Sequence, residues 1–273
     1  MPRAPRDREL EAGSRAHYED PAYYTKTYRS RVEDVRFYVD LAKHARGPVL
    51  EYGCGNGRIT LPAARAGASI TGVDLSPPML ADLRARLRAE PTEVRARVTL
   101  RRGDMRESRL GRRFALVICP FNAFLHLYAR SDVERFLARA RAHLAPKGQF
   151  VLDLSVPQPE ELARDPAKAY FAPRFRYPNA DGSAGPTIRY SERFDYDTVR
   201  QVLFVAMEFA PTEGGEPWMT PLAHRQFYPE ELAALLHYNG FEITERYGDF
   251  FRGPLESSSA TMVVCCRARR SYR

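Results

Sequence analysis

Short apolar segments alternate with helical patterns through the first 155 residues, and this alternation restricts the fold more than any other feature. The apolar segments are rich in Val, Ile, Leu and Phe, as the buried strands of parallel sheets are. Alternating strands and helices form an open sheet with helices on both faces. We therefore predict an α/β fold whose first strands are PVLEYG (48–53), SITGVDL (69–75), VTLRRGDM (98–105), FALVICPF (114–121) and GQFVLDLS (148–155).

Two of the predicted helices have recognisable ends. The helix after the second strand is expected to begin at Ser76, an N-cap residue followed by proline in the first turn. The helix before the fifth strand is expected to begin at Ser131, with Glu134 completing a capping box. It is expected to stop at Pro146-Lys147-Gly148 (146–148).

The pattern changes after Asp153. Residues 156–187 are rich in proline and show no long periodic segment, whereas residues 187–211 alternate like an antiparallel hairpin that turns near Asp195–Thr198. Residues 221–229 are a candidate third strand, and a helix ended by Gly240 then restores the α/β pattern with two more strands. We therefore divide the chain into an N-terminal helical, tyrosine-rich cap (1–47), a core (48–155 and 229–273) and an inserted antiparallel β lid (156–228).

Composition and charge exclude several classes of protein. With 273 residues, 44% hydrophobic and 28% charged, the chain is typical of globular proteins and unlike disordered or collagen-like chains. No apolar run approaches the ~20 residues that cross a bilayer, and no secretory signal is visible, so we expect a cytoplasmic protein without membrane contact. The net charge of +8 comes from arginines scattered over predicted helix faces, so nucleic acid is not the expected partner and RNA binding stays an alternative.

The four cysteines show no pattern of a metal site. No pair among them has the spacing of zinc ligands, so no metal is expected. Two adjacent cysteines near the C-terminus would point to opposite faces of a strand. We expect reduced thiols at all four positions: Cys54, Cys119, Cys265 and Cys266.

A glycine-rich loop follows the first predicted strand. In VLEYGCGNGR (49–58) the strand ends at Glu51, and Gly53, Gly55 and Gly57 precede a helix. Glycines in such a loop let the backbone turn tightly and approach a ligand closely.

Arg58 and Pro62, which follow this loop, do not fit the simplest pattern of a glycine loop followed by a regular helix. Arg58 stands where a G-x-G-x-x-G dinucleotide fingerprint would have its last glycine. Pro62 falls inside the following helix, which is therefore expected either to begin late, with Thr60 as its cap, or to be kinked.

The next three strands end in side chains that suit a nucleoside. Asp74 ends the second strand, where an acid is well placed to bind ribose hydroxyls. Asp104 and Met105 follow the third strand and offer a carboxylate for an adenine amino group and an apolar side chain for its ring. The fourth strand ends at Cys119-Pro120-Phe121-Asn122 (119–122). All of these tips lie at the carboxyl edge of the sheet, where open α/β folds bind ligands.

The Glu-x-Gly-x-Gly-x-Gly motif at 51–57, the acids at 74 and 104 and the polar, aromatic fourth-strand tip resemble the class I S-adenosylmethionine (SAM)-dependent methyltransferases in order and spacing. The resemblance covers about 48–155 and 229–273. It implies a Rossmann-like sheet of seven strands, with SAM as cofactor, S-adenosylhomocysteine (SAH) as product and no metal. By position it implies that the methionine end is held by Glu51, Gly53, Gly55 and Gly57, the ribose by Asp74, the adenine by Leu75, Met79, Asp104 and Met105, and the sulfonium by Cys119 to Phe121.

Two other classes compete with this interpretation. A dinucleotide dehydrogenase would need the glycine that Arg58 replaces and would gain nothing from Asp104. A SAM-binding relative without catalysis would be expected to have lost a glycine or an acid from the motif set, and none is missing here.

The segment CPFNAFLHL (119–127) resembles the fourth strand of small-molecule N-methyltransferases, notably the amino-sugar and glycine N-methyltransferases. A histidine occupies the place of His126 in those enzymes, so His126 is expected to start a helix at the sheet edge and to serve as a base or a positioning residue. We predict methyl transfer to a nitrogen or oxygen of a small molecule. The alternatives are an RNA methyltransferase and a protein or peptide amine methyltransferase.

The remaining acceptor contacts are expected from the cap, the strand-4 tip and the insertion. Tyr24 or Tyr28 is predicted to close over the methyl group, because tyrosine rings attract a sulfonium or ammonium. Trp218 lies in a Gly/Pro-rich loop and is expected to cover the pocket or to form a homodimer contact. The predicted substrate-binding residues are Asn122, Trp218, Arg225 and Tyr228, with Arg225 suited to a carboxylate or phosphate.

Overall fold

The computed structural model describes residues 5–269, which form two compact units. Within these residues, the larger unit consists of 31–156 and 227–269, and the smaller unit of 5–30 and 157–226. Residues 5–30 thus group with the segment that follows Val156. Residues 31–47 group with the glycine-rich loop and the strands around it.

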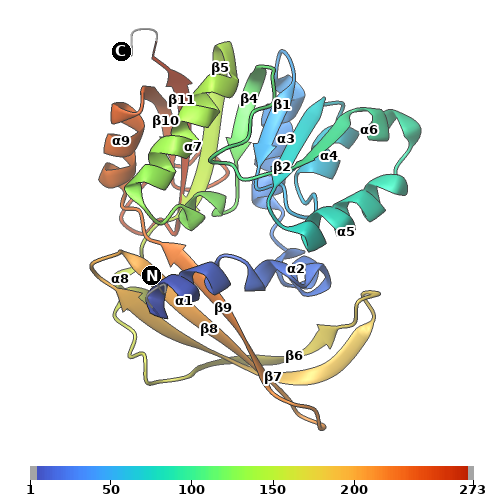
Figure 1. Ribbon diagram of the computed structural model, residues 1–273, viewed down its shortest axis with the longest axis vertical. Helices are drawn as coiled ribbons and strands as arrows, with labels where there is room; N and C mark the ends of the chain where they lie inside the picture. The colour runs from blue at the N-terminus through green and yellow to red at the C-terminus, as the bar shows by residue number, and fades with distance from the viewer. Residues whose placement is uncertain (1–4, 270–273) are drawn as a thin grey trace. The chain divides into compact units, whose positions relative to one another are not determined.

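Within the described residues, the larger unit contains one seven-stranded sheet in the order β10-β11-β5-β4-β1-β2-β3 (Figure 1). Neighbouring strands are parallel, except that β11 runs antiparallel to β10 and β5. This is the mostly parallel sheet predicted from the sequence, and chain order reverses beside β1, where such sheets bind ligands. The strands are β1 (Val49–Tyr52), β2 (Ile70–Asp74), β3 (Val98–Arg102), β4 (Phe114–Cys119), β5 (Leu144–Ser155), β10 (Phe241–Tyr247) and β11 (Thr261–Ala268).

Helices cover both faces of this sheet, because each buried strand sends alternate apolar side chains to opposite faces (Figure 1). In β5, Phe150 and Leu152 pack with α7 and α9, whereas Val151 packs with α3 and α4. Cys265 and Cys266 also face opposite sides, and all four cysteines are free, as predicted. The helical elements are α3 (Glu33–His44), α4 (Thr60–Arg65), α5 (Pro77–Arg88), α6 (Thr92–Ala96), the 3-10 turn η2 (Ala123–His126), α7 (Arg130–His143) and α9 (Pro229–Tyr238).

Two predicted helix ends are confirmed and one is wrong. Ser76 caps α5, because its hydroxyl accepts a hydrogen bond from the backbone N–H three residues on at 3.3 Å. Gly240 follows the end of α9 with a φ of +83°. The expected stop at 146–148 is wrong: α7 ends at His143 and β5 begins at the next residue, so the Pro-Lys-Gly segment lies inside the strand.

The predicted capping box at the start of α7 is also wrong. The helix begins one residue earlier than predicted, and Ala129 occupies the N-cap position. The carboxylate of Asp132 accepts the N–H of Ala129 at 3.3 Å, so it is Asp132 that reaches back to the cap. Ser131 is inside the helix, and Glu134 forms an ion pair with Arg130 instead.

The smaller unit contains, within residues 5–269, a four-stranded antiparallel sheet in the order β6-β7-β8-β9. The predicted hairpin is β7 and β8, and it turns at 198–201, slightly later than expected, because β7 continues through Asp197. The elements of this unit are α1 (Pro5–Gly13), η1 (Ala16–Tyr18), α2 (Pro21–Tyr28), α8 (Pro159–Leu162), β6 (Tyr170–Pro178), β7 (Ala184–Asp197), β8 (Val202–Pro211) and β9 (Trp218–Arg225).

Two features of this unit differ from expectation. Strand β6 lies in the proline-rich stretch where no regular element was predicted. It is an edge strand with irregular pairing to β7 around Pro173, and such an edge tolerates proline. Trp218 is the first residue of β9 rather than part of a loop, and its ring stacks on Phe209 at a centroid distance of 5.1 Å.

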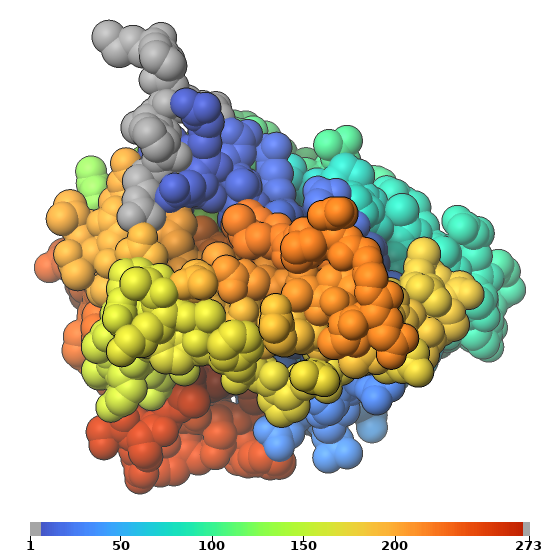
Figure 2. Space-filling view, turned by 90° about the horizontal axis from the view of Figure 1, so that it is seen from below, coloured from blue at the N-terminus to red at the C-terminus, as the bar shows by residue number. Residues whose placement is uncertain are grey.

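The N-terminal helix packs directly on the small sheet. Figure 2 shows the blue N-terminal residues beside the orange strand β9. A Cβ atom added to Gly13 would lie 2.7 Å from the Cβ of Ala223, so glycine allows this close approach. Among residues 5–269, none of the helices is long and apolar enough to cross a membrane.

Candidate functional site

The glycine-rich loop joins β1 to α4 in the larger unit. Gly53, Gly55 and Gly57 have φ values of +68°, +53° and +86°, which L residues with side chains rarely adopt. A Cβ atom on Gly57 would overlap Cδ1 of Leu83, and one on Gly55 would lie 3.2 Å from Cε of Met79. The loop is therefore compact against α5 and needs glycine at these positions.

Helix α4 begins late, as one of the two sequence alternatives predicted. Ile59 occupies the N-cap position, so the prediction that Thr60 is the cap is wrong. The hydroxyl of Thr60 instead donates to Oε2 of Glu51 at 2.5 Å. Pro62 lies in the first turn, where its missing N–H has no helical partner in any case.

Glu51 is a buried carboxyl at the end of β1. Only 2% of its surface is exposed, and burial raises its pKa to about 8, although the Thr60 hydrogen bond and the charge of Arg58 oppose that shift. At pH 7 the group is therefore mostly protonated. A carboxyl held in this form can give up its proton when a cation approaches.

Asp74 joins the end of β2 to the glycine-rich loop. Its Oδ2 accepts the N–H of Gly55 at 2.7 Å, and its Oδ1 accepts the N–H of Ser76 at 2.8 Å. Burial raises the pKa of Asp74, while these backbone hydrogen bonds act against the shift. Leu75 is exposed beside it and Met79 is buried in α5 below Gly55, so the structure gathers these predicted residues around one loop.

Asp104 and Met105 follow β3, as predicted, but the carboxylate of Asp104 has a partner of its own. Nη2 of Arg106 lies 2.6 Å from Oδ2 of Asp104, and Nη1 of Arg106 lies 2.9 Å from Oδ1 of Asp132. Burial raises the pKa of Asp104, but the hydrogen bonds from Arg106 outweigh it and lower the pKa overall. Arg106 was not predicted as this partner, although it stands only two residues after the acid.

The tip of β4 lies against the glycine-rich loop. Cys119 is fully buried, and Phe121 and Asn122 have left-handed φ values of +54° and +62°. A Cβ atom on Gly53 would lie 2.7 Å from the Cβ of Ala123, so the two segments are in close contact. The structure thus brings the strand-4 tip beside the first glycine of the loop.

Two buried acids near this tip were not predicted. Asp34 in the first turn of α3 forms an ion pair with Arg58, and Asp153 of β5 accepts the hydroxyl of Tyr38 at 2.6 Å. Burial raises the pKa of Asp153 to about 6. The available sequence signals were an arginine directly after the glycine loop and a lone acid in the apolar strand VLDLS.

His126 follows the strand-4 tip, as expected, but the prediction that it starts a helix is wrong. It is the last residue of the 3-10 turn η2 and does not start a helix, because α7 begins only at Arg130. Its Nδ1 lies 3.1 Å from the hydroxyl of Tyr128, and the side chain is half-buried. The ring is therefore held by a neighbour on the same short segment.

The other predicted acceptor residues are divided between the units. Tyr228 precedes α9 in the larger unit and is exposed. In the smaller unit, Arg225 ends β9 and Trp218 begins it. The rings of Tyr24 and Tyr28 lie 4.7 Å apart.

An unpredicted histidine lies beside these tyrosines. Nε2 of His17 is 2.9 Å from the Tyr28 hydroxyl, and burial lowers the pKa of His17 to about 4, so the ring is neutral at pH 7. Rings of Tyr18, Tyr23 and Tyr24 also pack around it. The sequence signal was a histidine next to a run of tyrosines.

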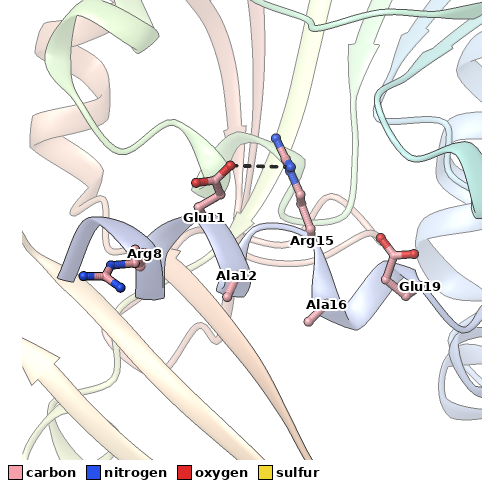
Figure 3. A pocket seen from close by; sticks show the side chains of 6 residues that line it. All are labelled: Arg8, Glu11, Ala12, Arg15, Ala16 and Glu19. Atoms are coloured by element: carbon pink, nitrogen blue, oxygen red, sulfur yellow. Dashed lines mark ion pairs between the residues drawn. The ribbon is translucent and has the colours of Figure 1, made fainter. Parts of the chain in front are cut away.

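A surface hollow of about 380 Å3 lies along α1 and η1 of the smaller unit (Figure 3). Arg15 forms an ion pair of 3.5 Å with Glu11 at its edge, and none of the predicted site residues lines it. Across residues 5–269 there is no group of three or more His, Cys, Asp or Glu side chains that could hold a metal ion.

Comparisons with known proteins agree with this geometry. A family model described as a methyltransferase domain matches residues 49–148. The dTDP-3-amino-3,6-dideoxy-alpha-D-glucopyranose N,N-dimethyltransferase of Streptomyces fradiae is 32% identical over 128 residues, which are 47% of this chain and 47% of the relative. The chain thus matches about half the length of the curated relatives.

Solved structures match over much more of the chain. The CcbJ methyltransferase from Streptomyces caelestis is 26% identical, with a TM-score of 0.75 over 94% of this chain and 99% of the other. SAM-bound CalS10, an amino pentose methyltransferase from Micromonospora echinaspora, is 24% identical, with a TM-score of 0.65 over 90% and 96%. The strand order, the assembled strand tips and these matches show that the chain is similar to the class I SAM-dependent methyltransferases and has their Rossmann-like fold.

Proposed function

We propose that the chain binds SAM and transfers its methyl group to a nitrogen of a small-molecule acceptor. The observation that carries this proposal is the hydrogen bond from the Gly55 N–H to the carboxylate of Asp74, which ties the glycine-rich loop to the tip of β2. A ribose diol needs a carboxylate at this point, and a nucleoside needs a loop without side chains beside it.

The residues present fit this cofactor. Glycines at 53, 55 and 57 give the loop a tight left-handed backbone that packs closely on the strand-4 tip and on α5, and Glu51 offers a buried carboxyl to the methionine ammonium. Asp74 would bind the ribose, with Leu75, Met79, Asp104 and Met105 around the adenine and Cys119 to Phe121 along the sulfonium. Asp104 would share its carboxylate between Arg106 and the adenine amino group.

The protein's task in this reaction is mainly alignment. SAM supplies a methyl group on a positively charged sulfur, so the donor is already activated. Holding an acceptor in line with it contributes up to ~7–11 kcal/mol in favourable cases. An ammonium acceptor has no lone pair for attack, so a base that takes its proton would add roughly 10²–10⁴-fold.

We assign the acceptor side to His126 and to the tyrosines of α2. His126 would take the proton or position the acceptor, and Tyr24 or Tyr28 would close over the methyl group through their ring faces. Asn122, Arg225, Tyr228 and Trp218 would contact the rest of the acceptor, with Arg225 suited to a phosphate or carboxylate.

An amino sugar carried by a nucleotide is the acceptor class we propose. The Streptomyces fradiae relative is named for a dTDP-linked amino sugar, and CalS10 for an amino pentose. An RNA acceptor has less support, because several helix arginines already form ion pairs within the protein, among them Arg86 with Asp82 and Arg135 with Glu107. A cytoplasmic location and a homodimer remain parts of the proposal.

Calorimetric titration with SAH and a transfer assay with methyl-labelled SAM test this function. We expect micromolar SAH binding and transfer of label to dTDP-3-amino-3,6-dideoxy-alpha-D-glucose or to a related nucleotide amino sugar. Absence of SAH binding would reject the cofactor assignment. SAH binding together with labelling of RNA, and of no nucleotide amino sugar, would reject the acceptor class.

A further inference from the structure

The strand-4 tip contains an unusual backbone turn. Phe121 and Asn122 are adjacent, neither is glycine, and both have left-handed φ values, +54° and +62°. Asparagine tolerates this region, but a bulky residue such as phenylalanine rarely adopts it. Backbone strain of this kind persists only where the surroundings fix it, and it gathers at functional sites.

One residue of β5 holds both backbone N–H groups of the turn. Oδ1 of Asp153 accepts the N–H of Phe121 at 2.9 Å, and the carbonyl oxygen of Asp153 accepts the N–H of Asn122 at 3.4 Å. The side chain of Asn122 pairs with Ser155, whose N–H donates to Oδ1 of Asn122 at 2.7 Å. The strained turn is therefore pinned to the end of β5.

The ring of Phe121 is held from another direction. The guanidinium groups of Arg58 and Arg31 lie 4.3 and 5.0 Å from the ring centroid. Arg58 is itself fixed, because its Nη1 donates to Oδ1 of the buried Asp34 at 2.9 Å. The arginine that ends the glycine-rich loop thus covers the side chain of the turn.

Burying the carboxylate of Asp153 carries a desolvation penalty. Its neighbours Leu152 and Leu154 are fully buried apolar residues, and only 3% of Asp153 is exposed. Its known partners are the Tyr38 hydroxyl and the Phe121 N–H, both on Oδ1. An apolar side chain at this position would pack in the sheet without the desolvation penalty, but it could not accept the N–H of Phe121.

The Phe121–Asn122 turn also lies next to the glycine-rich loop. A Cβ atom built on Gly53 would lie only 2.7 Å from the Cβ of Ala123. The segment after the turn therefore has little room to move toward the loop. A turn that relaxed from its left-handed conformation would shift Ala123 and press on Gly53. Asp153 therefore acts on the loop through the turn, without being part of it.

We propose that Asp153 is a positioning residue for the cofactor site, which holds the strained Phe121–Asn122 turn against the glycine-rich loop. The inference rests on the proposed function, because it assumes that this loop binds SAM. It goes further by giving a role to a buried acid that the methyl-transfer mechanism does not use.

The test compares SAH affinity and unfolding temperature in matched variants. Asp153→Ala removes the side-chain oxygen that accepts the Phe121 N–H and leaves the carbonyl oxygen that accepts the Asn122 N–H, whereas Asp153→Asn keeps a side-chain acceptor for Phe121. Val263→Ala is the control, because Val263 is fully buried and lies opposite Asp153 in the β11–β5 register, away from the turn. Tyr38→Phe removes the hydroxyl that orients Asp153 and provides a milder variant should Asp153→Ala not fold.

We expect Asp153→Ala to weaken SAH binding at least tenfold, Tyr38→Phe three- to tenfold, and Asp153→Asn less than threefold. Val263→Ala should lower the unfolding temperature while its SAH affinity stays within threefold of wild type. Affinity that stays unchanged in Asp153→Ala, or in Tyr38→Phe if the former does not fold, would overturn the inference and leave Asp153 as a stability element. So would losses that merely follow the unfolding temperature in all variants. Wild-type protein that does not bind SAH would refute the proposed function itself.

Discussion

The carboxylate of Asp74 accepts the backbone N–H of Gly55 at 2.7 Å, across two segments that are separate in the sequence. The loop and the strand tip are therefore not independent contacts for a nucleoside. Each holds the other in place, so a change at either position alters both. This coupling directs the first prediction.

Asp74→Ala should weaken SAH binding by about 10- to 100-fold. The change removes the proposed ribose contact and also frees the Gly55 N–H, and hydrogen bonds to a charged group contribute about 1.5–3 kcal/mol each. The SAH affinity of Asp74→Asn should lie between those of wild type and Asp74→Ala, because asparagine keeps one acceptor oxygen. Titration calorimetry measures the affinities, with Glu256→Gln as an exposed control. Equal affinity in both Asp74 variants and wild type would contradict the site.

Gly57→Ala should destabilise the protein more than Gly67→Ala. Both glycines have positive φ, +86° and +103°, so both substitutions strain the backbone. Only at Gly57 would the new Cβ atom overlap Leu83, whereas no atom lies within 4 Å at Gly67. We expect about 1 kcal/mol lost at Gly67 and roughly 2–4 kcal/mol at Gly57. Denaturant unfolding measures both, and equal losses would contradict the packing against α5.

The core of the fold was predictable because its signals are local. Apolar strands, the Ser76 cap and the glycine loop each depend on a few adjacent residues, and all appear where the sequence indicates. The predicted start of α7 was wrong because Asp132, and not Glu134, accepts the N–H of the N-cap residue. Two acids so close in the sequence give the same capping pattern, so the pattern does not distinguish them. Strand β6 was not predicted because proline normally indicates that a segment is not a strand. At the edge of the sheet the missing N–H of proline costs no hydrogen bond to a neighbouring strand.

The site was predictable only as far as strand tips. A parallel sheet brings its carboxyl ends together, so Glu51, Asp74 and the strand-4 tip could be expected at one edge. Asp153 and Tyr38 are 115 positions apart in the chain, and their hydrogen bond follows from which faces of β5 and α3 meet. Arg106 is a local partner of Asp104, but nothing in the sequence says that it binds the acid.

His126→Asn separates a base from a positioning role. If His126 takes the acceptor proton, the variant should lose roughly 10²–10⁴-fold in rate together with the limb of the pH–rate profile near neutral pH. Tyr128→Phe is the companion variant, because it removes the hydroxyl 3.1 Å from Nδ1 and leaves the imidazole in place. Unchanged profiles in both variants, and in Tyr24→Phe and Tyr28→Phe, would leave alignment as the whole mechanism.

Glu51 should make the protein less stable as the pH rises from about 5 to 8. Its folded-state pKa of about 8 lies above the ordinary value of 4.5, so the folded protein keeps a proton that the unfolded chain has already lost. Unfolding free energy should therefore fall by roughly 1–4 kcal/mol across this window. Glu51→Gln, which is neutral throughout, should flatten the dependence. Parallel curves for variant and wild type would show that Glu51 is ionised in the folded state.

The same proton should leave when the cofactor product binds. Glu51 can pair with the ammonium of SAH only when its side chain is an ionised carboxylate. At pH 7, however, the buried Glu51 carboxyl is mostly protonated in the free protein. Binding should then release close to one proton per SAH, and Thr60, which donates to the same carboxyl at 2.5 Å, would help to hold the charge that forms. Calorimetry in phosphate and in Tris reveals the release as a buffer-dependent binding enthalpy. Glu51→Gln should abolish that dependence and bind SAH more weakly. A buffer-independent enthalpy in wild type, with undiminished affinity in Glu51→Gln, would remove Glu51 from the methionine end of the site.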